Sequence, residues 1–140
     1  MPSSRPLSPH LGIYRWRVTM FQSTMHRLTG LFLCAGALLL AWGLIAAADG
    51  ADAWAVFAGF CKSWPGLVLL FLWTWSLLFH LVNGIQHLFR DAGRNFGPPR
   101  RDREFKPVYW STGWIVIVLS VALTVLVWVL LMMHVGGVAA

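Results

Sequence analysis

The residues best suited to chemistry lie together in one apolar stretch: His80, Gly84 and His87. On a helix, with about 100° per residue, His80 and Gly84 are about 40° apart, and His80 and His87 about 20° apart. One face therefore carries an imidazole, a position without a side chain, and a second imidazole about 10 Å further along the axis. Neutral imidazole is a standard axial ligand of haem iron, and glycine lets a flat macrocycle lie against the backbone. The spacing predicts a haem-bearing helix.

The elements that must position these residues are membrane spans. Of 140 residues, 58% are hydrophobic and only 11% are charged, which excludes an ordinary soluble domain. Apolar runs without charge cover approximately 28–48, 64–89 and 110–133, and each is long enough to cross about 30 Å of hydrocarbon. The sequence therefore predicts an all-α integral membrane protein with three transmembrane helices. We divide it into an N-terminal interfacial arm, 1–20, and a three-span anchor, 21–140.

The net charge of +6 is distributed as in a membrane protein and does not indicate nucleic-acid binding. The basic residues border the apolar runs in two patches, one before the first span and one between the second and third. The patches comprise Arg5, Arg15, Arg17 and Arg27, and then Arg90, Arg94, Arg100, Arg101, Arg103 and Lys106. Cytoplasmic segments carry such an excess of Lys and Arg, and three spans place both patches on the same side. We predict a cytoplasmic N-terminus.

For His80 the residue alone leaves a second interpretation open, namely a polar contact satisfied by a hydrogen bond across the helix bundle. An ionisable residue within a span is costly, however, and is a functional hypothesis by default. His87 is too far along the same helix to supply a second axial ligand, so the iron takes a ligand from another helix or is five-coordinate. We expect His26 near the inner surface and His134 near the outer end of the third span. The missing ligand points to a partner chain.

A second polar group, Ser23, His26 and Arg27, lies where the first span begins. Spacings of three and four residues place the three side chains near one another on a helix face. The structural interpretation is helix capping by the serine and a positive charge anchored at the inner surface. The functional interpretation is a hydroxyl and a guanidinium that donate hydrogen bonds to a carbonyl oxygen of a lipid-soluble substrate. The residues by themselves leave both open.

Three motifs, taken in order, carry a family resemblance. They read R-P-L-S-P-H-L at 5–11, S-T-M-H-R-L-T-G at 23–30, and H-x3-G-I-x-H-L-x2-D-x-G at 80–93. Together they resemble the cytochrome b subunits of succinate dehydrogenase, a family of membrane anchors of respiratory complex II. The resemblance covers the arm, the three spans, their spacing and the total length.

The resemblance implies a subunit that is not catalytic alone but belongs to a succinate:quinone oxidoreductase. In that family a flavoprotein and an iron–sulfur subunit oxidise succinate, and two small membrane anchors dock them to the bilayer. The anchors form a heterodimeric haem-binding bundle, share one haem b to which each gives a histidine, and pass electrons to ubiquinone. Two alternatives remain: an anchor of a quinol–fumarate reductase, which runs in the opposite direction, and a purely structural anchor without haem.

Residue by residue, the resemblance implies that His80 is the haem axial ligand. It implies a haem environment made by His87, His26, Gly84 and Arg27, and a quinone site at Ser23 and Arg27. One position departs from the family, which commonly has arginine immediately before the second histidine, where this chain has Gln86. The partner of the haem propionates then stays open between Arg27 and Arg90. Arg90 also stands where the family usually has an aromatic residue or methionine.

The beginning of the chain bears on localisation. Prolines and polar residues occupy the place where a signal peptide has an apolar core, and the folded pattern begins too early for a transit peptide. We therefore expect a multi-pass protein of the bacterial inner membrane, with the mitochondrial inner membrane as the alternative.

Overall fold

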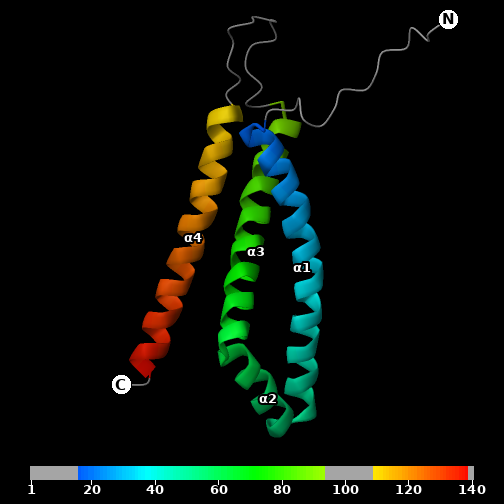
Figure 1. Ribbon diagram of the computed structural model, residues 1–140, viewed down its shortest axis with the longest axis vertical. Helices are drawn as coiled ribbons and strands as arrows, with labels where there is room; N and C mark the ends of the chain where they lie inside the picture. Colours follow the sequence, from blue (N-terminus) through cyan, green and yellow to red (C-terminus); the bar gives the residue numbers. More distant parts are fainter. Residues whose placement is uncertain (1–15, 94–108, 139–140) are drawn as a thin grey trace, which may run out of the picture.

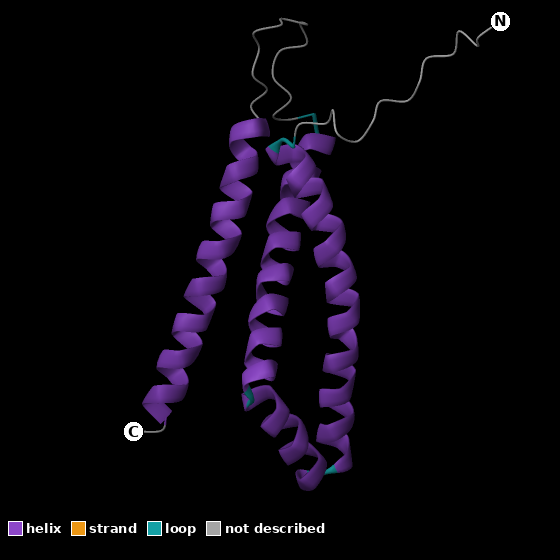
Figure 2. Ribbon diagram, viewed as in Figure 1, coloured by secondary structure: helices purple, strands orange, loops and turns teal. Residues whose placement is uncertain are grey.

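The computed structural model describes residues 16–93 and 109–138, and within these ranges it is helical, with no strand (Figures 1 and 2). The helices are α1 (Val18–Asp49), α2 (Ala51–Lys62), α3 (Trp64–Asp91) and α4 (Tyr109–Val138). Three candidate membrane spans meet the requirements of length and composition: Val18–Asp49, Trp64–Asp91 and Thr112–Val135. The predicted fold class, an all-α protein with three transmembrane helices, is confirmed. The 5–11 motif and the basic loop 94–108 lie outside the described residues.

Helix α1 begins earlier than the apolar run 28–48 suggests. Its N-cap is Arg17, in extended backbone, so Ser23, His26 and Arg27 all lie inside the helix. The capping interpretation of Ser23 is therefore wrong, because a cap precedes the first helical turn and Ser23 follows it. The helix starts before the apolar run because polar residues remain compatible with a helix where it passes through the headgroup region.

The connection between α1 and α3 is a short helix packed against the end of α1. Gly50, with φ 123°, lies between α1 and α2 in a conformation that glycine adopts without strain. Trp42 of α1 contacts Phe57 and Phe60 of α2, with ring centroids 5.1 and 5.3 Å apart. The residues between the first two spans are thus mostly helix. Ser63 then caps α3, since its Oγ accepts the Gly66 N–H at 3.3 Å.

The interior of the bundle is small and polar, and its outside is apolar. The buried hydrophobic side chains of the described residues are only Ala46, Phe79 and Val116, whereas leucines, valines and tryptophans cover the surface. The buried polar residues are Gln22, Thr29, Ser76, Asn83, Gln86, Ser120 and Thr124. In lipid there is no gain from burying leucine, so small and hydrogen-bonding residues hold the helices together instead. The exposed apolar surface is what the bilayer or a partner helix covers.

Helix α4 shows this use of small and hydroxyl-bearing residues most clearly, because none of its residues is a candidate for ligand binding. Its buried positions are Gly113, Val116, Ser120 and Thr124, spaced three or four residues apart along one face. The hydroxyls of Ser120 and Thr124 donate to the carbonyl oxygens of Ile117 and Ser120, at 2.9 and 2.7 Å, so both hydroxyls are satisfied within the helix. The stripe allows α4 to pack closely on its neighbours.

Two glycines of α1 receive large side chains of α3, as their small size predicts. A methyl group on Gly36 would collide with the indole of Trp73, and one on Gly30 would lie 3.2 Å from Cε1 of His80. Both positions are therefore points of close approach between α1 and α3. This packing brings the histidine stretch of α3 against the polar motif of α1.

Candidate functional site

His80 lies on α3 with its imidazole against α1. Its Nδ1 is 3.2 Å from the carbonyl oxygen of His26 and 3.3 Å from Oγ1 of Thr29. Because a backbone carbonyl can only accept, Nδ1 carries the proton and Nε2 keeps its lone pair. Among the described residues no hydrogen bond to Nε2 is found. The cross-bundle hydrogen bond that was the alternative to ligation exists, but it uses one ring nitrogen and leaves the other for a metal.

The three histidines of the two motifs come together. The ring of His26 stacks on that of His80, with centroids 3.8 Å apart and planes inclined by 13°, and it lies 5.6 Å from the ring of His87. Within 16–93 and 109–138 no cluster of three or more His, Cys, Asp or Glu has the arrangement of a metal site. The imidazoles overlap and do not converge on one point. The arrangement of these three rings therefore does not suit a bare metal ion bound by all of them.

We expected His26 near the inner surface and in the haem environment, and its ring stacks directly on that of His80. Because α1 begins at Val18, His26 is about 12 Å along the helix from its start. At that depth His26 is level with His80. Gly30, one turn further along α1, has no side chain and so leaves room for the His80 ring. The contact between His26 and His80 depends on how α1 packs against α3. Residue spacing within either helix does not reveal that packing.

Open space lies beside Gly84, on the face that also carries His80 and His87. A methyl group built on Gly84 would meet no atom within 4 Å. His87 is exposed and His80 is partly exposed, and the helical period places both on this face. A haem requires an imidazole with a free nitrogen and a flat, unobstructed surface beside it, and these residues fit both requirements.

Ser23 and Arg27, one turn apart on α1, are both exposed in this chain. The structure thus brings His26 of their motif into the histidine cluster but leaves the hydroxyl and the guanidinium on the surface of the bundle. Donors that face outward near the start of α1 are available to a substrate or to a partner subunit. The exposure of Ser23 and Arg27 is compatible both with binding a substrate and with a positive charge anchored at the membrane surface.

A buried amide cluster, which the sequence analysis missed, lies on the adjacent face of α3. Nε2 of Gln22 donates to Oδ1 of Asn83 and to Oε1 of Gln86, at 3.0 Å each. The three side chains are 2%, 0% and 8% exposed. A methyl group on Gly113 of α4 would lie 2.8 Å from Oε1 of Gln22, so all three spans meet at this cluster. The available signal was three amide side chains in two predicted helices, Gln22 in the first and Asn83 and Gln86 in the second.

The amide cluster also accounts for Gln86, which stands where the family commonly has arginine. Gln86 is engaged with Gln22 and almost fully buried, on the side of α3 that faces α1 and α4. It is therefore not directed at the open space beside Gly84. Of the two arginines left open as its replacement, Arg27 is exposed beside His26 in sequence, and Arg90 is partly buried.

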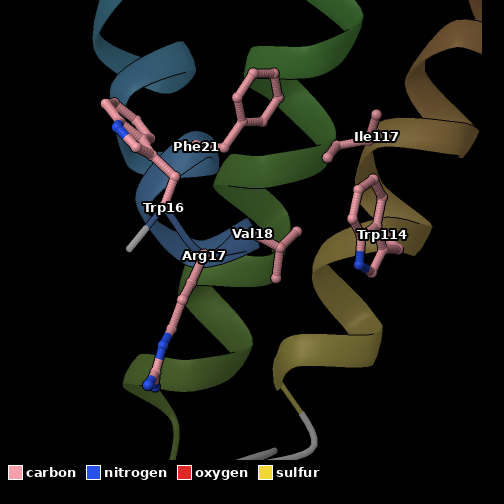
Figure 3. Close-up of a pocket in the computed structure, with 6 residues that line it drawn as sticks. All are labelled: Trp16, Arg17, Val18, Phe21, Trp114 and Ile117. Carbon is pink, nitrogen blue, oxygen red and sulfur yellow. The ribbon is translucent and has the colours of Figure 1, made fainter. Parts of the chain in front are cut away.

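A pocket lies elsewhere, between the N-terminal ends of α1 and α4 (Figure 3). It measures about 430 Å³ and is lined by Trp16, Arg17, Val18, Phe21, Trp114 and Ile117. Figure 3 shows the aliphatic and aromatic side chains around the hollow, with the Arg17 guanidinium extended away from them. Phe21 and Ser23 are about 200° apart on the helix, so this pocket and the Ser23–Arg27 pair lie on opposite sides of α1.

Fold and site together define a class: a small polytopic helical membrane protein with stacked imidazoles between two of its three spans. Its residues 1–127 match the family described as "Succinate dehydrogenase/Fumarate reductase transmembrane subunit". The chain belongs to this family as a succinate dehydrogenase cytochrome b subunit, a membrane anchor of complex II.

Individual relatives agree with the family assignment. The succinate dehydrogenase cytochrome b556 subunit of Paracoccus denitrificans is 43% identical over 64% of this chain and 69% of its own length. That of Rickettsia felis is 38% identical over 91% of this chain and 93% of its own. The mitochondrial cytochrome b560 subunit of Mus musculus is 32% identical over 85% and 67%. Three spans and bacterial relatives make this a multi-pass bacterial membrane protein.

Proposed function

We propose that this chain carries half of the haem site of a succinate:quinone oxidoreductase, with His80 as one axial ligand to a haem b shared with a second small anchor subunit. The observation that carries the proposal is the state of His80: Nδ1 is bonded to a backbone carbonyl, which leaves Nε2 with its lone pair, and open space lies at Gly84, one turn further on the same helix face. Bound there, a haem b supplies one-electron storage within the membrane.

The other residues of the cluster have separate roles in this proposal. His26 holds the His80 ring from one face, and His87, exposed about two turns further along α3, lies near the haem propionates. Arg27, which is exposed and carries a fixed positive charge, pairs with a propionate in place of the family arginine absent at Gln86. The second axial ligand comes from the partner anchor, since within the described residues His26 and His87 are both turned to the same cluster as His80.

Ser23 and Arg27 bind the head group of ubiquinone. A hydroxyl and a guanidinium at the inner end of α1 donate hydrogen bonds to a quinone carbonyl oxygen and stabilise the negative charge that develops on it during reduction. Both side chains are exposed, so a quinone can reach them from the bilayer or from the interface with the second anchor. The same inner end docks the iron–sulfur and flavoprotein subunits, which donate the electrons.

A reduced-minus-oxidised absorbance spectrum of the intact, detergent-purified complex tests the haem proposal. We expect a dithionite-reducible b-type spectrum, because the residues around His80 and Gly84 fit a haem. The control is the complex purified in parallel from cells depleted of haem precursors. A complex that assembles with all its subunits and shows no b-type absorbance would make the chain a structural anchor.

The orientation in the membrane is a further proposal. Arg17, Arg27 and Arg90 lie at the end of the bundle where α1 and α4 begin and α3 ends, whereas Asp49 and Lys62 lie at the other end (Figure 1). By the positive-inside rule the first end is cytoplasmic and the C-terminus is periplasmic. We expect alkaline phosphatase fused after Ala140 to be active and green fluorescent protein fused there to be dark. The opposite result from both reporters would reverse the topology.

A further inference from the structure

Thr29 on α1 faces the protonated edge of His80 and has no assigned role in ligand binding. It is 3% exposed, and its Oγ1 lies 3.3 Å from Nδ1 of His80. The same oxygen lies 2.7 Å from the carbonyl oxygen of Met25 and 3.1 Å from that of His26. The hydroxyl is thus surrounded by two acceptors and one imidazole nitrogen.

The direction of each hydrogen bond follows from what these groups can donate. The carbonyl oxygens only accept, so the single hydroxyl proton of Thr29 points to them, most directly to Met25. The lone pairs of Oγ1 then face the imidazole, and Nδ1–H of His80 donates both to Thr29 Oγ1 and to the carbonyl oxygen of His26. Shared, three-centre bonds of this kind are common in helical proteins.

We propose that Thr29 is a positioning residue for the haem ligand: it accepts a hydrogen bond from Nδ1–H of His80 and thereby holds the tautomer and ring plane in which Nε2 ligates iron. This inference rests on the proposed haem ligation by His80. The ring of His26, stacked at 3.8 Å, restrains His80 from its face, and Gly30 leaves room for its Cε1 edge. Thr29 therefore supplies the hydrogen-bond acceptor for the His80 ring, and Gly30 supplies the space that this ring occupies.

A hydrogen bond to the distal nitrogen of a ligating histidine has two measurable consequences. It orients the ring, and it raises the basicity of the ligating nitrogen, which favours oxidised iron. Outer partners of this kind are worth about 10–100-fold in metal affinity. Since the His26 carbonyl remains when Thr29 is changed, we expect the lower end of that range.

The test compares Thr29→Val, which keeps the shape and removes the acceptor, with Thr29→Ser, which keeps the hydroxyl. Thr124→Val is the matched control, because Thr124 is equally buried and its hydroxyl bonds a carbonyl one turn back, but it lies on α4. In the intact complex, we expect Thr29→Val to release haem to apomyoglobin about tenfold faster and to shift the haem midpoint potential upward. Thr29→Ser and Thr124→Val should match the unaltered complex in both measurements.

Several outcomes would overturn the role of Thr29. One is a Thr29→Val complex with unchanged haem release and potential; another is a Thr29→Ser complex that shifts as far as Thr29→Val. If Thr29→Val does not assemble, Thr29→Ala is measured in the same way, and failure of both beside a normal Thr29→Ser would assign the residue to helix packing. His80→Ala keeps the two proposals apart: retained b-type absorbance in that variant refutes ligation itself, whereas its loss beside a normal Thr29→Val refutes only the role of Thr29.

Discussion

Replacing His80 with alanine should abolish the b-type spectrum of the complex or weaken it severely. The substitution removes the proposed iron ligand, an imidazole on the same helix face as the open space at Gly84. It leaves the helix intact, because alanine is a good helix former and Phe79, Asn83 and the rest of α3 still pack against α1 and α4. Assembly should survive in part, measured as co-purification of all subunits.

His87→Ala is the control for His80→Ala. His87 is exposed at the edge of the cluster, 5.6 Å from the ring of His26, and its loss removes a polar neighbour but no iron ligand. The b-type spectrum should persist, and the haem midpoint potential should shift, because polar groups near the haem tune it. If His87→Ala lost the spectrum and His80→Ala kept it, the assignment of the ligand to His80 would be wrong.

Ser23→Ala and Arg27→Leu should each lower succinate–quinone reductase activity about tenfold or more. Each change removes a hydrogen-bond donor to an oxygen that gains charge during reduction, and a hydrogen bond to a charged group contributes roughly 1.5–3 kcal/mol. Succinate oxidation with an artificial dye should stay largely intact, since that reaction is complete in the soluble subunits. Both side chains are exposed, so their loss removes no packing from the bundle.

Matched controls distinguish loss of quinone binding from failed assembly and from the loss of a positive charge alone. Ser120→Ala removes a hydroxyl that is satisfied within α4, and should leave both activities unchanged. Arg17→Leu removes a positive charge from the same end of α1, but on the side of the pocket in Figure 3. Equal loss of dye and quinone activities in the Ser23 and Arg27 variants would indicate failed assembly. Loss of quinone reduction confined to Arg17→Leu would place the quinone in that pocket.

Most of the architecture was predictable because a membrane imposes it on the sequence. In hydrocarbon every backbone polar group must be paired within its own helix, so length and hydropathy alone identify spans such as 64–89 and 110–133. Small residues such as Gly30 and Gly36 let helices approach closely, and α3 packs on α1 at both positions. The start of α1 at Val18 was not predictable in this way, because a helix in the headgroup region needs no apolar residues.

The candidate site, like the fold, was predictable from the sequence only in part. The sequence by itself determined the three-span helical fold, the family, and the face of one helix on which His80, Gly84 and His87 lie, because these properties follow from composition and from the helical period. Only the tertiary structure decided that His26 stacks on His80, that Gln86 turns into an amide cluster with Gln22, and that Thr29 meets the protonated edge of His80. Each of these contacts joins residues more than fifty positions apart. Their geometry depends on the rotation and depth of α1 against α3, which side-chain packing sets and no local pattern encodes.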